Sequence, residues 1–347
     1  MFRNQRMRLL GVLLATALLA VLAGCGGDEG SEAATGKSAD TTTTSRQDQP
    51  KKKPRLIEIT IDGYPTADYA GLFLANERGY FEDAGLEVSI HTPIIPKRPV
   101  PYVLEGAVEL GVSHAPEVIL ARKRGAPIVA VGALLPHPTL SIIWLENSGI
   151  RGVGDLKGKT IGTEGVPYQK RLLEAILAKA NLSLEDVKVL RVGYSLTSAL
   201  EKGRVDAIIG GSWNVEGVKL QAEGPKPAVV PVADLGFPSY DELVLVARQD
   251  RLPKTGAKVH DFMKAWARGN RAAIEDPEAA VEVLSEEGAV LSRQVIAEGV
   301  DVTLPLLSKT FRLGSPRWRR FTDWMHAEGI SERPPPVSKL LTNAYTP

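Results

Sequence analysis

The chain has 347 residues, a formal net charge of +1 at pH 7 and 44% hydrophobic residues. This length predicts one large or two medium domains, and the balanced charge gives no basic surface of the kind that binds nucleic acid. Cys25 is the single cysteine, which excludes an intrachain disulfide and a metal site built from several thiolates. The sequence therefore predicts an ordinary globular body with no cofactor, no metal site and no nucleic-acid partner.

Residues 1–24 have the three parts of a bacterial export signal. Three arginines in the first eight residues precede an uncharged apolar run from Leu9 to Ala23. That run is shorter than the roughly 20 residues that a spanning helix needs. Small residues then lead to Cys25, as in the signals of bacterial lipoproteins. We expect Cys25 to carry a lipid that holds the chain on the extracytoplasmic side of the membrane; the alternative is a plain secretory signal that is cut nearby.

Residues 26–55 are rich in Gly, Ser, Thr, Asp and Gln and end in Lys51-Lys52-Lys53-Pro54-Arg55. Such a stretch cannot bury enough apolar surface to offset the entropy that it would lose on ordering. We therefore expect residues 25–55 to form a disordered tether and the folded body to begin at residue 56. The three lysines either end a solvated linker or contact anionic lipid head groups.

The body opens with a strand, a helix and a second strand. Leu56–Asp62 alternates apolar and polar residues and is rich in β-branched types, which predicts a strand. Ala70–Arg78 is an apolar helical segment that Gly79 stops, and Leu86–Ile90 has the composition of another strand. This order predicts a βαβ unit with parallel strands.

A second unit of the same kind lies further along the chain. Residues 160–162 predict a short strand, Pro167 occupies the first position of a helix, and residues 187–192 predict the next strand. One face of this helix is apolar and carries Leu172, Leu173, Ile176, Leu177 and Ala180. A second βαβ unit is therefore expected.

The chain also contains an internal echo. Residues 104–131 and residues 200–232 both read as helix, short buried strand, polar loop, helix and strand. The polar loops are Ser113–Glu117 in the first copy and Gly210–Glu216 in the second. Repetition of one supersecondary order predicts two similar α/β lobes.

Two apolar strand candidates, Leu140–Leu145 and Glu242–Ala247, lie where the chain would leave one lobe and return to it. Two such crossings form a hinge. We expect lobe 1 to comprise residues 56–142 and 246–347, and lobe 2 to comprise residues 143–245. Because ligands of open α/β sheets bind beyond the carboxyl ends of the strands, the cleft between the lobes is the expected site.

Five segments of the body carry a recognisable pattern: DGYPTADYAGLFLA (62–75), GYFEDAGLEV (79–88), DLKGK (155–159), GGSWNVEG (210–217) and RWRRF (317–321). Together they resemble the solute-binding lipoproteins of ABC importers and, within them, the thiamine-pyrimidine-precursor-binding family. Trp213-Asn214-Val215-Glu216 is the most specific piece. The resemblance implies a periplasmic binding protein type II-like α/β fold, a monomer, and an ABC permease with its ATPase as partners.

The first loop departs from the family pattern. That loop often reads Asp-Trp-x-Pro-Asn, followed by His before Ala-Gly. Here Gly63, Thr66 and Tyr69 stand in the Trp, Asn and His places. The aromatic ring that this loop contributes is therefore expected at Tyr64 or Tyr69.

A pyrimidine-like ligand needs an aromatic face to stack on and hydrogen-bonding groups in the plane of its ring. The candidate ligand-binding residues are Asp62, Tyr64, Tyr69, Ser113, His114, Tyr168, Trp213, Asn214 and Glu216. Tyr64, Tyr69 and Trp213 supply stacking faces. The carboxylates of Asp62 and Glu216 accept bonds from a ring nitrogen and its amino group, and an asparagine both donates and accepts.

Some of these residues also have purely structural explanations. Trp213 is suited to pack between lobes, and Glu216 favours a helix N-terminus through the helix dipole. Asp62 is suited to cap a turn, and His114 to stand in one. The helix that begins at Pro167 lacks one N–H donor, so we expect Tyr168 to line the cleft and no anion to bind there.

Relatives that import sulfonates or nitrate need positive character in the cleft, whereas these loops offer carboxylates, aromatic rings and an amide. A thiamine precursor of the hydroxymethylpyrimidine or formylaminopyrimidine type is therefore expected, with riboflavin or another small solute as the alternative. Fungal relatives of this fold work in pyrimidine synthesis. The sequence carries no zinc-protease, nucleophile-elbow or phosphate-loop motif, so we expect a binder and not an enzyme.

Overall fold

A computed structural model describes residues 53–93, 99–287, 290–332 and 334–347. The export signal, Cys25 and nearly all of the tether lie outside the described residues, so these remain predictions. Within the described ranges, no helix is both long enough and apolar enough to cross a membrane.

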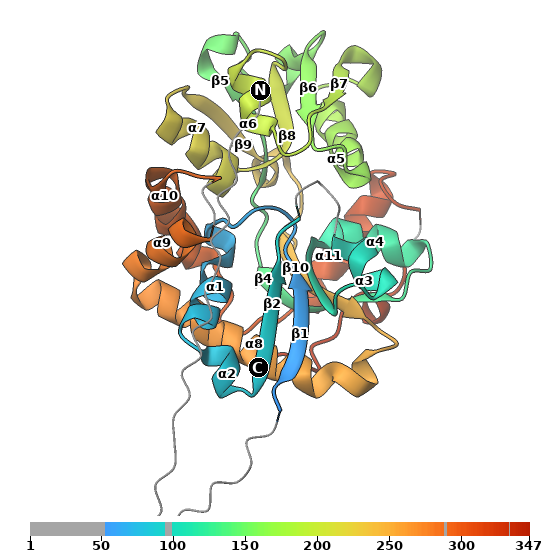
Figure 1. The fold of residues 1–347 in the computed structure, drawn as a ribbon. Coiled ribbons are helices and arrows are strands. Elements are labelled where there is room, and N and C mark those ends of the chain that lie inside the picture. Colours follow the sequence, from blue (N-terminus) through green and yellow to red (C-terminus); the bar gives the residue numbers. More distant parts are fainter. Residues whose placement is uncertain (1–52, 94–98, 288–289, 333) are drawn as a thin grey trace, which may run out of the picture. The chain divides into compact units, whose positions relative to one another are not determined.

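The first lobe of the body is built on a mixed five-stranded sheet, sheet A (Figure 1). Its strand order is β2-β1-β3-β10-β4. β1 is parallel to β2 and β3, whereas β10 is antiparallel to β3 and β4. The first predicted βαβ unit is thereby confirmed. The strands are β1 (Arg55–Thr60), β2 (Leu86–His91), β3 (Leu110–His114), β4 (Ile128–Leu135) and β10 (Leu243–Arg248).

The second lobe is built on sheet B, whose order is β7-β6-β8-β5-β9. When β6, β7, β8 and β9 are matched to β1, β2, β3 and β4, the two sheets have the same order, and each receives one antiparallel strand at the same place. The echo in the sequence is thus a repeated topology. The strands are β5 (Leu140–Leu145), β6 (Thr160–Thr163), β7 (Lys188–Arg191), β8 (Ala207–Ser212) and β9 (Pro227–Pro231).

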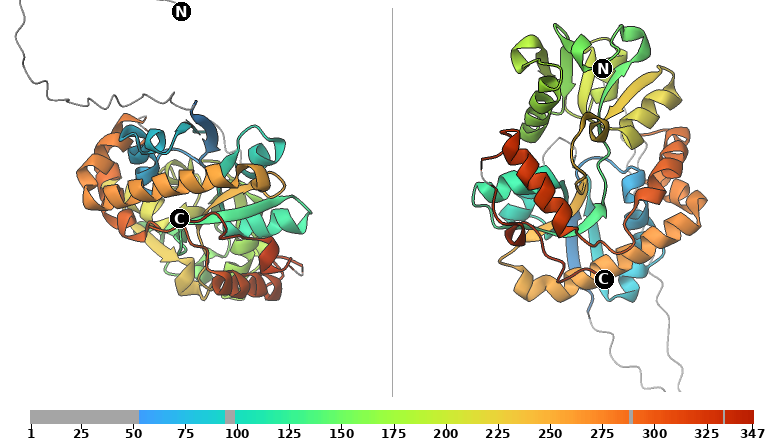
Figure 2. Two further views of the ribbon diagram at one scale, coloured as in Figure 1. Left: turned by 90° about the horizontal axis from the view of Figure 1, so that it is seen from below. Right: turned by 180° about the vertical axis from the view of Figure 1, so that it is seen from behind.

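Helices cover both sheets (Figures 1 and 2). Those of the first lobe are α1 (Ala70–Glu77), α2 (Tyr80–Asp83), α3 (Pro99–Glu105), α4 (Ala115–Lys123), α8 (Leu252–Glu275), α9 (Pro277–Glu286), α10 (Arg293–Thr303) and α11 (Ser315–Ala327). Those of the second lobe are α5 (Pro167–Ala178), α6 (Leu196–Glu201) and α7 (Val218–Glu223). α5 begins at Pro167 as predicted and buries most of its predicted apolar face, but it ends before Ala180.

Sheet A is covered on both faces, which explains the continuous apolar runs of its central strands. Along β10, Leu243 and Leu245 pack into the core formed with α1 and α8, whereas Val244 and Val246 pack into the core formed with α3, α4 and α11. Side chains that alternate along a strand therefore serve two cores. A rigid sheet with covered faces leaves the loops at its strand ends to form the site.

The chain crosses between the sheets twice. β5 pairs along its length within sheet B, and β10 pairs along its length within sheet A. The crossing segments are therefore residues 136–139 and residues 236–242, just ahead of these strands. The sequence predicts the hinge at the strands Leu140–Leu145 and Glu242–Ala247. In the structure each of these strands belongs to one sheet, and the hinge is formed by the segments ahead of them.

Candidate functional site

Loops from both lobes enclose a cavity, in which about 620 Å³ is empty and part is open to solvent. The lining from the first lobe follows β1 and ends β3, and the lining from the second lobe follows β6 and β7 and ends β8, as strand-end binding predicts. The crossing segments and the start of β10 contribute the rest. The lining residues are Asp62, Gly63, Tyr64, Thr66, Asp68, Tyr69, His114, Thr139, Glu164, Tyr194, Gly210, Ser212, Val215, Glu216, Glu242 and Leu243.

The cavity is strongly acidic. Its lining carries the carboxyl groups of Asp62, Asp68, Glu164, Glu216 and Glu242. Among the described residues that line it, His114 is the one basic side chain, and there is no lysine or arginine. A cavity with this charge attracts cations and N–H donors and repels anions.

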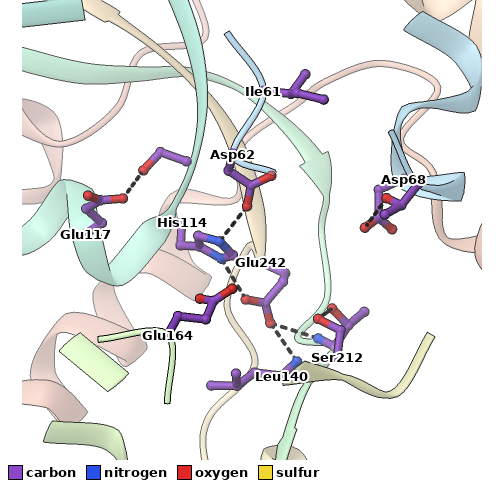
Figure 3. A network of polar contacts seen from close by, with 12 residues as sticks. Ile61, Asp62, Asp68, His114, Glu117, Leu140, Glu164, Ser212 and Glu242 are labelled. Atoms are coloured by element: carbon purple, nitrogen blue, oxygen red, sulfur yellow. Dashed lines mark hydrogen bonds and ion pairs between the residues drawn. The ribbon is translucent and has the colours of Figure 1, made fainter. Parts of the chain in front are cut away.

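His114 lies between two of these carboxylates (Figure 3). Its Nε2 is 2.9 Å from Asp62 Oδ2, and its Nδ1 is 3.0 Å from Glu242 Oε1. Burial by itself lowers the pKa of His114, but the two carboxylates outweigh burial and raise that pKa to about 10. The ring is therefore an imidazolium at neutral pH, and both of its N–H groups already have partners. Over the described part of the chain, no cluster of His, Cys, Asp or Glu is arranged to hold a metal ion.

Glu242 connects this histidine to the crossing segments. Its Oε2 accepts hydrogen bonds from the backbone N–H of Thr139 at 2.8 Å and of Leu140 at 2.9 Å, and from the hydroxyl of Tyr240 at 2.9 Å. Because three donors and an imidazolium hold the carboxylate, its place in the cavity wall is fixed.

Glu216 lies on a π-helical turn, Trp213–Gly217, which continues from the end of β8. Its Oε2 accepts a 2.7 Å hydrogen bond from the backbone N–H of Ser212. Burial, followed by the charges of Glu164 and Asp68, raises the pKa of Glu216 to about 8, although the hydrogen bond from Ser212 opposes the shift. At pH 7 this carboxyl group is therefore mostly protonated.

Two side chains of the second lobe make polar contacts with the first lobe beside the cavity. Asn214 of the second lobe donates from Nδ2 to Asp68 Oδ1 at 2.8 Å and to Thr303 Oγ1 at 3.0 Å. The hydroxyl of Tyr194 donates to the backbone oxygen of Asp62 at 2.7 Å. Burial raises the pKa of Asp68 to about 7, and the hydrogen bond from Asn214 limits that rise. These contacts hold the lobes together as the structure shows them.

Comparison with known proteins adds the family to this geometry. Residues 66–280 match the family described as NMT1/THI5 like. This chain belongs to that family. It is 30% identical over 289 residues to the formylaminopyrimidine-binding protein of Halalkalibacterium halodurans. The alignment covers 80% of this chain and 87% of that protein.

The family includes proteins with an enzyme name as well. The chain is 26% identical over 285 residues to the 4-amino-5-hydroxymethyl-2-methylpyrimidine phosphate synthase of Aspergillus parasiticus, covering 79% of this chain and 83% of the synthase. The fold of this chain is similar to that of the alkanesulfonate-binding protein SsuA from Xanthomonas axonopodis pv. citri bound to MOPS, with a TM-score of 0.67 and 19% sequence identity. That match covers 84% of this chain and 99% of SsuA, which confirms the periplasmic-binding-protein-like fold.

Of the nine ligand-binding residues predicted for this family member, five line the cavity: Asp62, Tyr64, Tyr69, His114 and Glu216. Asn214 contacts the other lobe instead, and its side chain is buried. Trp213, at the first position of the π-helical turn, is partly buried and is not among the lining residues. Their roles toward a ligand remain predictions.

The last two predicted residues lie behind the cavity wall. Ser113 and His114 are adjacent along β3, so their side chains point to opposite faces of the sheet. Ser113 is fully buried, and its hydroxyl donates to Glu117 Oε2 at 2.7 Å. The ring of Tyr168 is 5.7 Å from the ring of His114, but Tyr168 is not among the lining residues.

Several lining residues were absent from the prediction. They include Asp68, Thr139, Glu164, Tyr194, Ser212 and Glu242. Glu164 directly follows β6 much as Asp62 follows β1, so the rule applied to the first copy of the echo also identifies it in the second. Glu242 has no such signal, because its position depends on how the second crossing segment folds back past Thr139.

Proposed function

We propose that this chain is the extracytoplasmic ligand-binding component of an ABC importer. We propose further that its ligand is a thiamine pyrimidine precursor of the hydroxymethylpyrimidine or formylaminopyrimidine type. The observation that carries the proposal is the charge of the cavity, with five carboxyl groups and one histidine that is already paired. An aminopyrimidine offers N–H donors and a basic ring nitrogen to such a wall, whereas a sulfonate or nitrate ion meets repulsion.

Recognition is assigned to Glu216 and to the tyrosines of the lining. An aminopyrimidine presents a ring nitrogen that accepts a hydrogen bond and an adjacent amino group that donates one. Since the pKa of Glu216 is raised to about 8, its carboxyl group holds a proton at pH 7, so that it donates to the ring nitrogen and accepts from the amino group. Tyr64, Tyr69 and Tyr194 supply aromatic surface, and stacking on one such ring contributes about 1–3 kcal/mol in nucleic-acid systems.

Capture proceeds by closure of the lobes. Ligand contacts made by both lobes shift the population toward the closed form. The bonds from Asn214 to Asp68 and from Tyr194 to Asp62 form across the closing interface and add to that shift. The lipid on Cys25 and the tether keep the body near a permease and its ATPase, to which the closed monomer delivers its ligand.

A thermal-shift screen of the full-length protein tests the ligand class. The hydroxymethyl and formylamino pyrimidines are expected to raise the melting temperature by about 4 °C at a concentration one hundred times the dissociation constant, which corresponds to about 2.7 kcal/mol. Nitrate serves as the anionic control, taurine as a zwitterionic sulfonate, and riboflavin as a control for stacking alone. A shift with taurine or nitrate and none with either pyrimidine would overturn the proposal.

Conversion of a pyrimidine is the second candidate function, and the synthase names among the relatives are what favours it. Against it, both nitrogens of His114 are engaged by carboxylates, so this histidine is not a free base. Incubation with each pyrimidine, followed by mass spectrometry, separates the two functions. A binder returns the ligand unchanged, whereas an enzyme yields a product whose amount exceeds that of the protein.

A further inference from the structure

The segment Arg317–Phe321 resembles the same family as the cavity residues, yet none of it lines the cavity. It lies in the first half of α11. This helix is on the side turned away from the viewer in Figure 1 and faces the viewer in the right view of Figure 2. Its side chains contact both segments in which the chain crosses between the sheets.

Two adjacent side chains make the polar part of this contact. Arg317 donates from a terminal guanidinium nitrogen to the backbone oxygen of Pro136, the residue that opens the first crossing segment. Its Nε is 3.1 Å from Oδ1 of Asp241 in the second crossing segment. Trp318 donates from Nε1 to the other oxygen of Asp241 at 2.6 Å. One arginine thus holds both segments, and Trp318 fixes the carboxylate that it uses.

Aromatic contacts extend the same attachment along α11. The ring of Phe321 stacks on Tyr240 with centroids 4.3 Å apart and an interplanar angle of 23°. One turn further, the ring of Trp324 is 4.4 Å from that of Phe237. Residues three or four apart lie on one face of a helix, so this face of α11 follows the second crossing segment along its length.

The second crossing segment is held from both sides. Asp241 is fully buried against α11, whereas the next residue, Glu242, lines the cavity and accepts bonds from Thr139 and Leu140. Successive side chains of an extended segment point to opposite faces. Any rotation of one lobe against the other has to change the backbone torsion angles of the crossing segments. These segments contact α11 on one side and form part of the cavity wall on the other.

We propose that Arg317, Trp318, Phe321 and Trp324, here called the hinge brace, set the angle between the two lobes. None of its four side chains lines the cavity. It positions Glu242, and through it the two halves of the site, by fixing both crossing segments to α11. Because this role concerns the empty protein, it does not depend on which ligand the cavity takes.

Distances between pairs of spin labels, measured by pulsed electron paramagnetic resonance on the ligand-free full-length chain, test the hinge brace. Spin labels are attached at Glu77→Cys in the first lobe and Lys202→Cys in the second, with Cys25→Ser removing the native thiol; both positions are exposed. Trp318→Phe keeps an aromatic ring but removes the N–H donor, and Arg317→Met removes the charge. Each is expected to raise the population at longer distances roughly fivefold.

Two controls separate positioning from general loss of structure. Arg320→Met makes the same change on an exposed position of α11 and is expected to leave the distances unchanged. Labels at Glu77 and Lys254, both in the first lobe, are expected to report the same distance in every variant. A merely structural role lowers the melting temperature without moving the interlobe distances measured well below it.

Asp241→Asn completes the set, since it removes the charge from the other side of the ion pair and keeps an acceptor for Trp318. The double variant with Arg317→Met is expected to open the lobes no further than Arg317→Met alone, because that change already breaks the ion pair that Asp241→Asn removes. Unchanged distances in Trp318→Phe and Arg317→Met, with both variants folded, would refute the brace. If Asp241→Asn does not fold, these two variants still decide.

Discussion

Replacing Asn214 by alanine is expected to weaken ligand binding about tenfold to a hundredfold, although its side chain lies outside the cavity lining. Asn214 gives two hydrogen bonds to the other lobe, one to Asp68 and one to Thr303. A hydrogen bond to a charged group contributes about 1.5–3 kcal/mol, and each 1.4 kcal/mol corresponds to a factor of ten in affinity. Because the pKa of Asp68 is about 7, its carboxyl group is only partly ionised at neutral pH, which favours the lower half of that range.

Stopped-flow binding and calorimetry with the hydroxymethylpyrimidine measure this effect. Since the lost bonds form between the lobes, the dissociation rate is expected to rise while the association rate stays nearly constant. Gln221→Ala is the matched control, because it removes an exposed amide from the neighbouring helix α7. It is expected to leave both rates unchanged.

A charged variant sharpens the test. Asn214→Asp places a second carboxyl group beside Asp68, so its defect is expected to be larger at pH 8 than at pH 5, where both groups are protonated to a greater extent. Affinity that is unchanged in Asn214→Ala, or lost through slower association alone, would show that closure does not depend on this contact.

Three further predictions concern the acidic cavity. The melting temperature of the ligand-free protein is expected to fall from pH 5 to pH 9. The pKa of His114 is raised from 6.5 to about 10, so its charge stabilises the fold fully below pH 6.5, and this contribution is lost as the pH rises through 10. The pKa values of Asp68 and Glu216 are raised to about 7 and about 8, so ionisation of these groups destabilises the fold as the pH rises to those values. Calorimetric scans check this, and a melting temperature that rises over the range contradicts it. Glu216→Gln is expected to weaken pyrimidine binding at least tenfold, about 1.4 kcal/mol, and to flatten its dependence on pH; equal titrations of variant and wild type argue against the carboxylate. Tyr194→Phe removes the hydroxyl that bonds to Asp62 and is expected to speed ligand release about two- to tenfold in stopped-flow traces, with no change meaning that this bond does not contribute to closure.

Much of the fold follows from local patterns. Alternation in residues 56–62 and the apolar run before Gly79 predict the first βαβ unit, and the echo predicts its repetition in a second sheet of the same order. Position at the end of a strand then identifies Asp62, Tyr64 and His114 as cavity residues. These inferences need only periodicity and the rule that ligands bind at strand ends.

Other features depend on contacts between distant parts of the chain. Trp213 and Asn214 follow a strand end as Asp62 does, but the π-helical turn that begins there brings Val215 and Glu216 to the cavity instead. The pairing of Asp241 with Arg317 joins residues that no periodic pattern relates. Sequence reasoning identified RWRRF as a family segment, but its contact with the crossing segments required the folded structure.

Isothermal titration of the full-length protein at pH 7, with 4-amino-5-hydroxymethyl-2-methylpyrimidine in one series and nitrate in another, tests the central claim most directly. The acidic cavity predicts saturable one-to-one binding of the pyrimidine and no heat of binding with nitrate. Saturable binding of nitrate, together with no binding of the pyrimidine, would contradict the account.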